Sequence, residues 1–468
     1  MQGRNSSEPS LFQMVDLEAL VPPNHRLRKI DSVLDLRFVH EAVAECYAAG
    51  KGRPGIDPEL ALRMMLLGVL YDLSDRELCE EIAMHAGFRW FCRLNFHDPV
   101  PDHSTLSRLR NERWAESGVW ERLRDEVLRQ CAEAGMISGR HLSLDGTQVE
   151  ADASMKSFRP VGPQPAEGDP EEPEGGGRRV QEPQSKGAWQ AHGQMLRNDT
   201  HRSTTDPDAR LYRKGNGQGA KLSYLVHDLI DTKSRVILRR RASHATTVAE
   251  REVGLDLLDE VLKEADELCS TAPEILTADA GYGTSGFVAD VLERGLTPHI
   301  PLQSGPEMEP LPTWQRRPFT LVEARARRER LRHIEARNRT REAYGTRGYT
   351  VSRLLRIRSE HNFAEAKELH GLRRARRRGL HRQEAHLELS AAVQNLKRLL
   401  SFQDRRRREA AAAAVAVQLI LLALAASQQR PAARSASEHV KPSSLRARIR
   451  RRPRIRTRIP SRPSSTAF

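Results

Sequence analysis

Residues 141–152 read HLSLDGTQVEAD, and this stretch decides how the rest of the chain is interpreted. Leu144 and Val149 belong to an apolar pattern that predicts a short buried strand, bounded by a turn at Gly146. Asp145 stands where that strand should be dry. A buried carboxylate is costly unless a cation or a hydrogen-bonding network accompanies it, so a partner for Asp145 is expected elsewhere in the chain.

Length and composition limit the class of protein. The chain has 468 residues, which predicts two or three domains, and its 38% hydrophobic residues are enough for a sizeable core. Five scattered cysteines without a C-x-x-C pair argue against a structural zinc site and a disulfide framework, and for a reducing compartment. The N-terminus lacks a basic-then-apolar signal pattern, so we expect a cytoplasmic protein.

Charge is distributed unevenly along the chain. The net charge is +14, but residues 401–468 carry 16 Lys and Arg against 3 Asp and Glu, and residues 315–400 carry 23 against 9. Residues 1–314 are therefore acidic, with a net charge of −13. A basic C-terminal third suggests a polyanionic partner, usually nucleic acid, although codon bias toward Arg is a plainer explanation for the tail.

Residues 10–135 are predicted to form an all-α domain. The segment 57–73, DPELALRMMLLGVLYDL, has a helix-start pattern followed by apolar residues at helical spacing. Ser74 and Glu77 form a capping-box pattern for a second helix, and a third helix is expected from about Asp102. Two short helices separated by a loop fit a helix-turn-helix-like unit that grips DNA, and they fit a plain helical bundle equally well.

Residues 157–197 contain the run RPVGPQPAEGDPEEPEGGGRRVQEPQSKG, which is rich in Pro, Gly and Glu. Such a composition cannot bury a core, so we expect a flexible insertion. Strand-like segments resume after it, which places the insertion inside a domain that we expect to span 138–400.

The segments that follow alternate between strand and helix patterns. With the strand at 141–145 they predict the order β-β-β-α-β-α-β, followed by long basic helices. The six segments after that first strand are, in order, 220–231, 234–243, 247–265, 273–279, 286–295 and 296–302. A hairpin followed by helix-separated strands implies an α/β fold with helices packed on a mixed sheet.

Two further carboxylates share features with Asp145. Asp279 follows an apolar run at the carboxyl end of a predicted strand, where α/β sheets place their ligands. Glu360 lies on a predicted helix, with Arg356 four residues before it and Lys367 seven residues after it on the same face. A face with one acid between two cations suits contact with a metal-bound phosphate.

Three such carboxylates can hold a pair of Mg²⁺ ions, which take oxygen ligands and leave positions for water and phosphate. Two ions about 4 Å apart activate the attacking oxygen and stabilise the leaving oxygen in phosphoryl transfer. Singly, each acid has a structural explanation, as a turn former at 145 and 279 and as a helix ion pair at 360. Their joint placement favours a metal site, so we expect the three carboxylates to converge.

Several motifs resemble those of bacterial insertion-sequence transposases with a DDE catalytic core. They are LSLDGTQVEADASMKSF (142–158), ILTADAGYGTSGF (275–287) and the pattern R-x3-E-x6-K formed by Arg356, Glu360 and Lys367. The N-terminal segment with PGIDPELALRMMLLGVLYDLSDRELCEEI is similar to the helical domain that precedes this core in one large group, and NDTHRSTTDPDARLYRKG (198–215) resembles the segment between its first two strands. The resemblance covers residues 10–400.

This resemblance implies an RNase-H-like fold, two bound Mg²⁺ or Mn²⁺ ions, and a location in the nucleoid. It also implies a homodimer that cleaves DNA at the terminal inverted repeats and joins it to target DNA. It assigns Asp145, Asp279 and Glu360 as catalytic metal ligands, and Arg356 and Lys367 as phosphate contacts. The family usually has Tyr seven residues before the Glu. Arg353 stands there instead, which leaves the finer handling of the DNA end in question.

Residues 401–468 lie outside the resemblance and are predicted to be a disordered, basic, low-complexity tail. Their apolar stretch EAAAAAVAVQLILLALAAS is at the low edge of membrane-spanning length and rich in Ala, so a solitary helix or an aberrant extension is favoured over a membrane anchor.

Two other function classes stay open. One is a DNA-binding protein that derives from a transposase and has lost catalysis, which the tail and the long insertion keep plausible. The other is a metal-dependent nuclease that cleaves DNA without strand transfer. Nicking of element-end DNA would distinguish a transposase from the DNA-binding protein without catalysis. Joining of the freed 3′ end would distinguish a transposase from the nuclease.

Overall fold

The computed structural model describes residues 16–47, 55–161, 188–191, 194–215, 217–246 and 248–428. The chain divides into two compact units, Met1–Arg408 and Glu409–Phe468. Every candidate site residue belongs to the first unit, which extends beyond the boundary at 400 that the sequence suggested.

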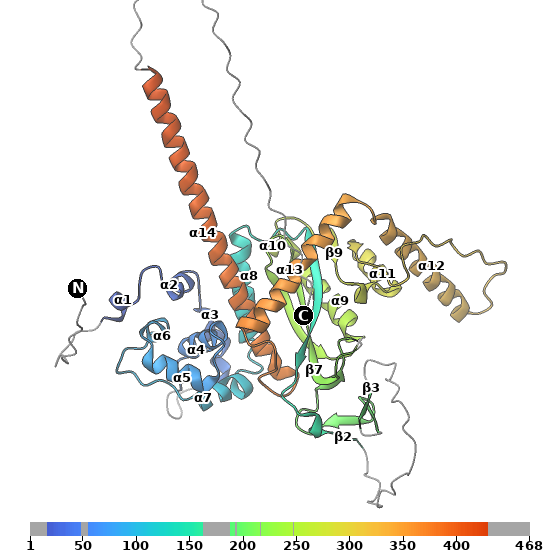
Figure 1. Cartoon of the computed structure of the whole chain (residues 1–468), viewed down its shortest axis with the longest axis horizontal. Coiled ribbons are helices and arrows are strands. Elements are labelled where there is room, and N and C mark those ends of the chain that lie inside the picture. Colours follow the sequence, from blue (N-terminus) through green and yellow to red (C-terminus); the bar gives the residue numbers. More distant parts are fainter. Residues whose placement is uncertain are drawn as a thin grey trace, which may run out of the picture. The chain divides into compact units, whose positions relative to one another are not determined.

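The first part of the chain is helical, as predicted (Figure 1). Its elements are α1 (Leu17–Leu20), α2 (Arg26–Asp31), α3 (Phe38–Ala42), η1 (Ala44–Cys46), α4 (Pro58–Leu70), α5 (Asp75–Met84), α6 (Ala86–Phe91), α7 (His103–Arg108), the π turn η2 (Leu109–Arg113) and α8 (Val119–Glu133). Ser74 and Glu77 form the predicted capping box of α5, and Asp102 caps α7. All residues of α4 from Ala61 to Leu70 are buried. A helix this enclosed forms the centre of a bundle and cannot lie in a DNA groove.

A mixed sheet follows, built from β1 (His141–Glu150), β6 (Arg210–Tyr212), β7 (Lys221–Asp231), β8 (Ile237–His244), β9 (Ile275–Thr277) and β10 (Thr297–His299). The strand order is β8-β7-β1-β9-β10, and β6 pairs with the start of β7. The middle strand β1 runs antiparallel to β7 and parallel to β9, and β7 is also antiparallel to β8. With α9 (Ala249–Lys263) and α11 (Ser285–Glu293) between the strands, the sheet contains the predicted order β-β-β-α-β-α-β and one further short strand, β6, that was not predicted.

The turn predicted at Gly146 is wrong, because β1 continues through it. Its pairing with β7 is unbroken from Leu142 to Glu150, so the partner strand supplies backbone hydrogen bonds on both sides of the glycine. A Cβ atom at 146 would lie 3.4 Å from both His227 Nδ1 and Tyr282 Oη. At that distance a Cβ atom would make ordinary van der Waals contacts, so neither a turn nor close packing requires a glycine here.

Helices cover the two faces of the sheet. On one face α9 contacts β7 and β8, and Gly254 of α9 lies so close to Leu144 that a Cβ atom there would be 2.6 Å from Leu144 Cδ2. On the other face α13 (Arg347–Leu369) contacts β1, β9 and β10. Because side chains alternate along a strand, Leu144 faces α9 and Asp145 faces α13. The remaining helices are α10 (Ala265–Leu268), α12 (Leu321–Glu342), which packs on α11, and α14 (His381–Gln428).

Much of the predicted flexible insertion, at 162–187 and 192–193, lies outside the described residues. Its described ends form short strands. β2 (Phe158–Pro160) pairs with β5 (His201–Ser203), and β3 (Ala188–Ala191) pairs with β4 (Gln194–Arg197).

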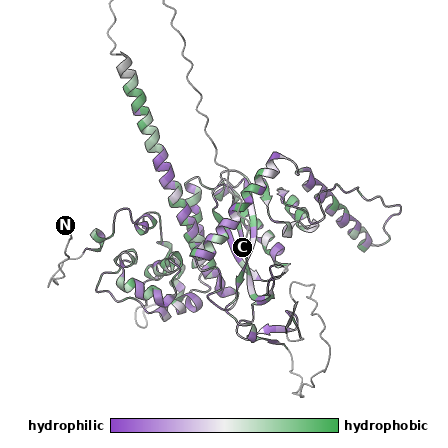
Figure 2. Cartoon of the chain, in the orientation of Figure 1, coloured by the Kyte–Doolittle hydropathy of each residue, from purple (hydrophilic) through white to green (hydrophobic). Residues whose placement is uncertain are grey.

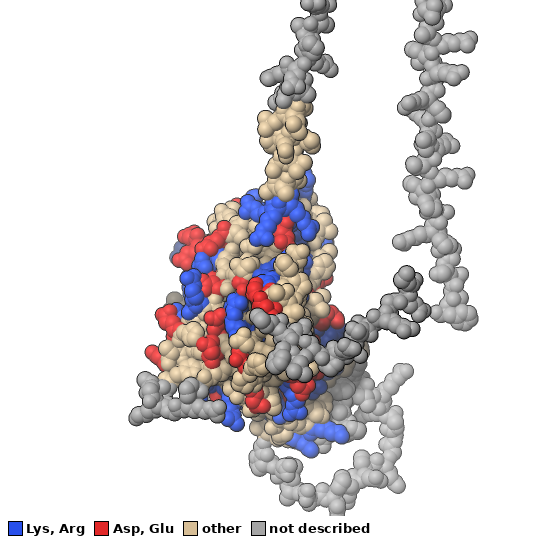
Figure 3. Space-filling model, turned by 90° about the vertical axis from the view of Figure 1, so that its left-hand side faces the viewer, with Lys and Arg blue, Asp and Glu red and all other residues tan. Residues whose placement is uncertain are grey.

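The predicted disordered tail is wrong for residues 401–428, which continue α14, whereas 429–468 lie outside the described residues. Ala and Leu are strong helix formers, and they extend a helix that tertiary contacts have already nucleated. After the charged run at 404–409, residues 410–428 contain no charged side chain. Figure 2 shows the outer part of α14 as largely hydrophobic, and Figure 3 shows it without charged side chains. Its large apolar side chains between Val415 and Leu422 are exposed. Among the described helices, none combines the length and hydrophobicity needed to cross a bilayer.

Candidate active site

The pairing of β1 with β9 brings the first two predicted carboxylates together. Ser143 pairs with Thr277, and each aspartate follows its strand residue by two positions. Two positions along a strand return the side chain to the same face, so Asp145 and Asp279 project from neighbouring parallel strands toward α13.

Asp145 is almost fully enclosed, with an exposed fraction of 8%. Burial, and next the nearby Asp279 carboxylate, raise the pKa of Asp145 to about 7, against the opposing effects of the Gly146 N–H, Arg356 and the Ser359 hydroxyl. The Gly146 N–H donates to Asp145 Oδ1 at 3.0 Å. The folded chain therefore holds a carboxyl group that resists ionisation while no cation is bound beside it.

Asp279 caps the short helical turn η4 (Ala280–Tyr282) that follows β9, and it accepts a hydrogen bond from the Gly281 N–H at 2.8 Å. The turn is tightly packed, since a Cβ atom at Gly283 would lie 2.0 Å from the Pro301 carbonyl oxygen. These contacts fix the Asp279 carboxylate at the end of its strand. The glycine-rich sequence after Asp279 is thus a requirement of packing.

Glu360 lies on α13 but does not join the two aspartates. Its side chain is 53% exposed and pairs with Arg356, with 3.1 Å between Arg356 Nη2 and Glu360 Oε1. The α13 residues that stabilise the Asp145 carboxylate are instead Arg356 and Ser359, which is fully buried. Across the described ranges, no group of three His, Cys, Asp or Glu side chains is arranged to hold a metal ion.

Lys367 lies two helical turns further along α13 and reaches β1. Its ammonium group donates to the Gln148 carbonyl oxygen at 3.0 Å. Burial, and then the positive charges of Lys214 and Arg373, lower the pKa of Lys367, while Glu150 and Asp145 oppose this effect. Arg356 and Lys367 thus flank the sheet face that carries Asp145.

The sequence reasoning missed a row of charges on the same face. Asp228 is the β7 partner of Asp145, and Arg240 is the β8 partner of Asp228. Both side chains are fully buried and form a two-pronged ion pair, with 2.7 Å for each N–O contact. Side chains alternate between the two faces of a strand, so the segments VHDLID (226–231) and ILRRRAS (237–243) could have suggested that one acidic and one basic side chain point into the protein. Asp228 is neutralised by Arg240, so we expect it to support the sheet and not to bind a metal.

One observation supports a divalent cation between the two aspartates. They are close enough to raise the pKa of Asp145, and a cation between them would remove that repulsion and supply the partner that the buried carboxylate lacks. Glu360 would complete the set only after leaving Arg356. In the arrangement described, two of the three predicted ligands fit the ion and the third does not.

Two segments of the chain match family models of transposase domains. Residues 15–112 match the family model of a transposase domain described as DUF772, and residues 196–396 match the model of the transposase DDE domain. A crystal structure of a pre-cleavage Mos1 transpososome is 10% identical over 76% of this chain and 82% of that chain, with a TM-score of 0.16, which is too low to carry weight.

The two matched domains follow each other in the order expected from the sequence motifs. Asp279 and the helix with Arg356, Glu360 and Lys367 lie within the matched DDE segment, whereas Asp145 precedes this segment and is brought beside Asp279 by the sheet. The chain therefore belongs to the insertion-sequence transposases, with a DDE domain that follows an N-terminal transposase domain.

Proposed function

We propose that this transposase binds the terminal inverted repeats of its element and carries out metal-dependent cleavage and strand transfer of DNA. The observation that carries the proposal is the pair Asp145 and Asp279, side by side on adjacent parallel strands beneath a basic helix. The strand order β8-β7-β1-β9-β10, with only β7 reversed, supports an RNase-H-like core. We infer a homodimer on the DNA from the resemblance alone.

Each residue has an assigned part in the proposal. Asp145 and Asp279 would hold Mg²⁺ or Mn²⁺, with Glu360 as the third ligand of a two-ion site. When bound, such ions activate an attacking oxygen and stabilise a leaving one. Arg356 and Lys367 would contact phosphates, and a phosphate that draws Arg356 away would free Glu360.

The Arg356–Glu360 ion pair also favours a second candidate, a DNA-binding protein without catalysis. If that pair persists when DNA is bound, the third ligand never reaches the aspartates. Binding would then continue while cleavage fails, so both candidates can be examined with one substrate.

The experiment uses a labelled duplex that carries the element end and its flank, with Mg²⁺, Mn²⁺ or EDTA, and a second duplex as target. We expect a metal-dependent nick with a free 3′ end, followed by joining to the target. Asp279→Asn should bind the duplex as the wild type does but lose cleavage, because it keeps the shape and removes one negative charge from the metal site.

Asp256→Asn is the matched control, since Asp256 is an exposed acid of α9 with no ion pair among the described residues, and it should cleave normally. Wild-type binding without nicking in either metal would favour the non-catalytic candidate. Nicking without joining would favour a nuclease. Normal nicking by Asp279→Asn would remove this residue from the site.

A further inference from the structure

A cavity of about 660 Å³ lies between the start of α5, the π turn η2 and the loop after α13. We call it the arginine cavity, because six cationic side chains line it: Arg110, Lys367, Arg373, Arg374, Arg376 and Arg377. Four carboxylates also line it, so the cavity is positive overall.

Four of the six cations already have a carboxylate partner. The pairs are Arg110 with Asp75 at 2.7 Å, Arg374 with Asp152 at 2.9 Å, Arg376 with Asp72, and Arg373 with Glu368. Lys367 and Arg377 have no ion pair within the described parts of the chain. The surplus charge of the arginine cavity therefore resides on these two side chains.

Arg377 is held in an unfavourable environment. Its Nη1 atom is shielded from solvent and, among the described residues, has no hydrogen-bond partner. Burial, and next the positive charge of Arg110, lower the pKa of Arg377. Lys367 is also half-buried, and its ammonium group donates to the Gln148 carbonyl oxygen. An anion in the cavity would offset the positive charge of both groups.

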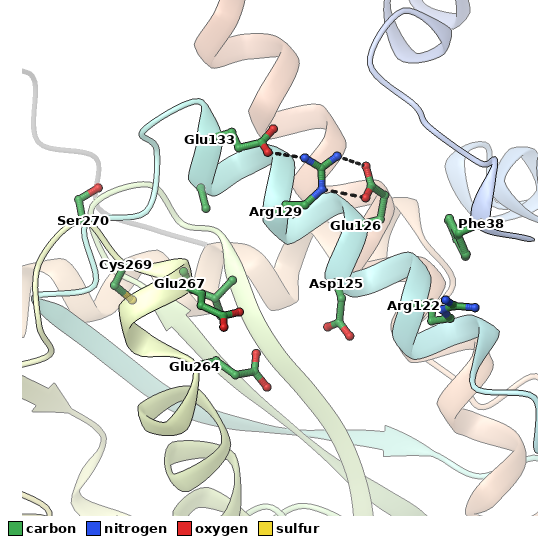
Figure 4. A pocket seen from close by; sticks show the side chains of 12 residues that line it. Phe38, Arg122, Asp125, Glu126, Arg129, Glu133, Glu264, Glu267, Cys269 and Ser270 are labelled. Atoms are coloured by element: carbon green, nitrogen blue, oxygen red, sulfur yellow. Dashed lines mark hydrogen bonds and ion pairs between the residues drawn. The ribbon is translucent and has the colours of Figure 1, made fainter. Parts of the chain in front are cut away.

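A second cavity shows the opposite character (Figure 4). It has a volume of about 810 Å³, lies by α8 and α10, and has five carboxylates against two arginines. One of these arginines, Arg129, is already engaged by Glu126 and Glu133. Phosphate would be repelled there, in contrast to the arginine cavity.

We propose that the arginine cavity binds a phosphodiester of the DNA backbone through Lys367 and Arg377. This inference rests on the proposed function and adds a contact outside the carboxylate site. Lys367 lies seven residues after Glu360 on α13, which is about 10 Å along the helix axis. That length equals about three steps along one DNA strand, so a strand that follows α13 from the cavity would pass Glu360 about three nucleotides away.

The cavity also joins α5 and η2 of the helical region to the loop after α13. A phosphate bound there would touch both parts of the molecule at once. The cavity would therefore fix the DNA relative to the carboxylates, in addition to raising affinity.

The test compares Arg377→Gln with Arg378→Gln in the full chain. Arg378 is the next residue and is exposed; it pairs with Asp152 and does not line the cavity. Binding of end duplex is measured by fluorescence anisotropy across a salt series. Arg377→Gln should bind about fivefold more weakly near physiological salt, with a salt slope smaller by about one. Its thermal midpoint without DNA should be unchanged or higher, since Arg377 gains no ion pair on folding. Arg378→Gln should match the wild type.

An unchanged affinity and salt slope for Arg377→Gln would overturn the inference while leaving the proposed function intact. Absence of DNA binding by the wild type would instead overturn the proposed function. If inorganic phosphate stabilises the wild type but not Arg377→Gln, and DNA binding is equal in both, the cavity binds a small anion and not DNA. If Arg377→Gln fails to fold, Lys367→Gln replaces it. Lys367 lines the same cavity, and a wild-type salt slope for that variant would also overturn the inference.

Discussion

At the scale of single residues, Asp145 shows both what a sequence reveals and what it conceals. An acid inside an apolar strand pattern predicted a buried carboxylate that needs a partner, and burial with a raised pKa confirms the first part. Its closeness to Asp279 follows from strand register, which no local pattern encodes. The position of Glu360 depends on the rotamers of one helical turn and on competition with Arg356, so sequence spacing alone could not show that the two side chains would pair.

The pKa of Asp145 leads to a prediction about stability. In the folded chain it is raised to about 7 from 3.8, so between these pH values the folded chain keeps a proton that the unfolded chain has lost. Without divalent metal, this carboxyl group should lower the free energy of unfolding as pH rises from about 4 to about 7. Asp145→Asn should therefore be more stable than the wild type by roughly 2–4 kcal/mol near pH 8, and nearly equal to it near pH 4.

Urea unfolding of both proteins in EDTA across this pH range measures the difference. Added Mg²⁺ should then stabilise the wild type and have little effect on Asp145→Asn, since the ion and the proton compete for one carboxylate. A stability difference that does not vary with pH would show that Asp145 is already ionised in the folded chain.

At the scale of elements, periodicity predicted the order of strands and helices well, because hydrophobic alternation and helix caps are local signals. The length of β1 was underestimated, because Gly146 resembles a turn residue until the long partner β7 is known. The helical continuation of α14 past residue 400 was also missed. The composition of residues 401–428 suggested disorder. These residues are helical because Ala and Leu have a high helix propensity and because they extend a helix that has already formed.

The buried pair Asp228 and Arg240 leads to a prediction about the sheet. Both side chains are fully buried, and Arg240 also donates to the Ser390 hydroxyl of α14 at 2.8 Å. Removing one partner leaves an uncompensated buried charge, so Arg240→Met should lower the free energy of unfolding by about 3–5 kcal/mol. Arg241→Met, on the half-exposed neighbour that pairs with Glu260, should change it much less.

The double variant Asp228→Leu with Arg240→Met tests the cause. It removes both charges, and it should recover much of the stability that Arg240→Met loses. If the double variant is as unstable as the single one, packing at β7 and β8 accounts for the loss, and the charge pair does not.

At the scale of the whole molecule, counting charges overstates the positive surface available to DNA. Residues 315–400 carry a net charge of +14 in the sequence. Many of these arginines are already paired, for example Arg332 with Asp290 and Arg337 with Glu309. Sequence composition predicted the polyanionic partner, but the pairing that decides which cations can contact it became visible only in the fold.

The extent of the first compact unit leads to the last prediction. That unit ends at Arg408, and the turn before its end is attached to the helical region by Asp404, 2.8 Å from Lys29, and by Arg406, whose Nη1 donates to the Ala134 carbonyl oxygen at 3.2 Å. A chain that ends at Arg408 should therefore keep the thermal midpoint of the full chain, whereas a chain that ends at Phe402 should unfold at a slightly lower temperature.

Residues 409–468 carry 12 Lys and Arg against 2 Glu, so the chain ending at Arg408 should also bind unrelated DNA more weakly and with a smaller salt slope. It should aggregate less than the full chain, because the exposed apolar side chains between Val415 and Leu422 are gone. Cleavage of element-end DNA with Mg²⁺ should persist, since the sheet, α13 and the arginine cavity all lie before Arg408. If this shortened chain folds and binds end DNA but does not cleave it, while the full chain does, then residues after 408 take part in the reaction.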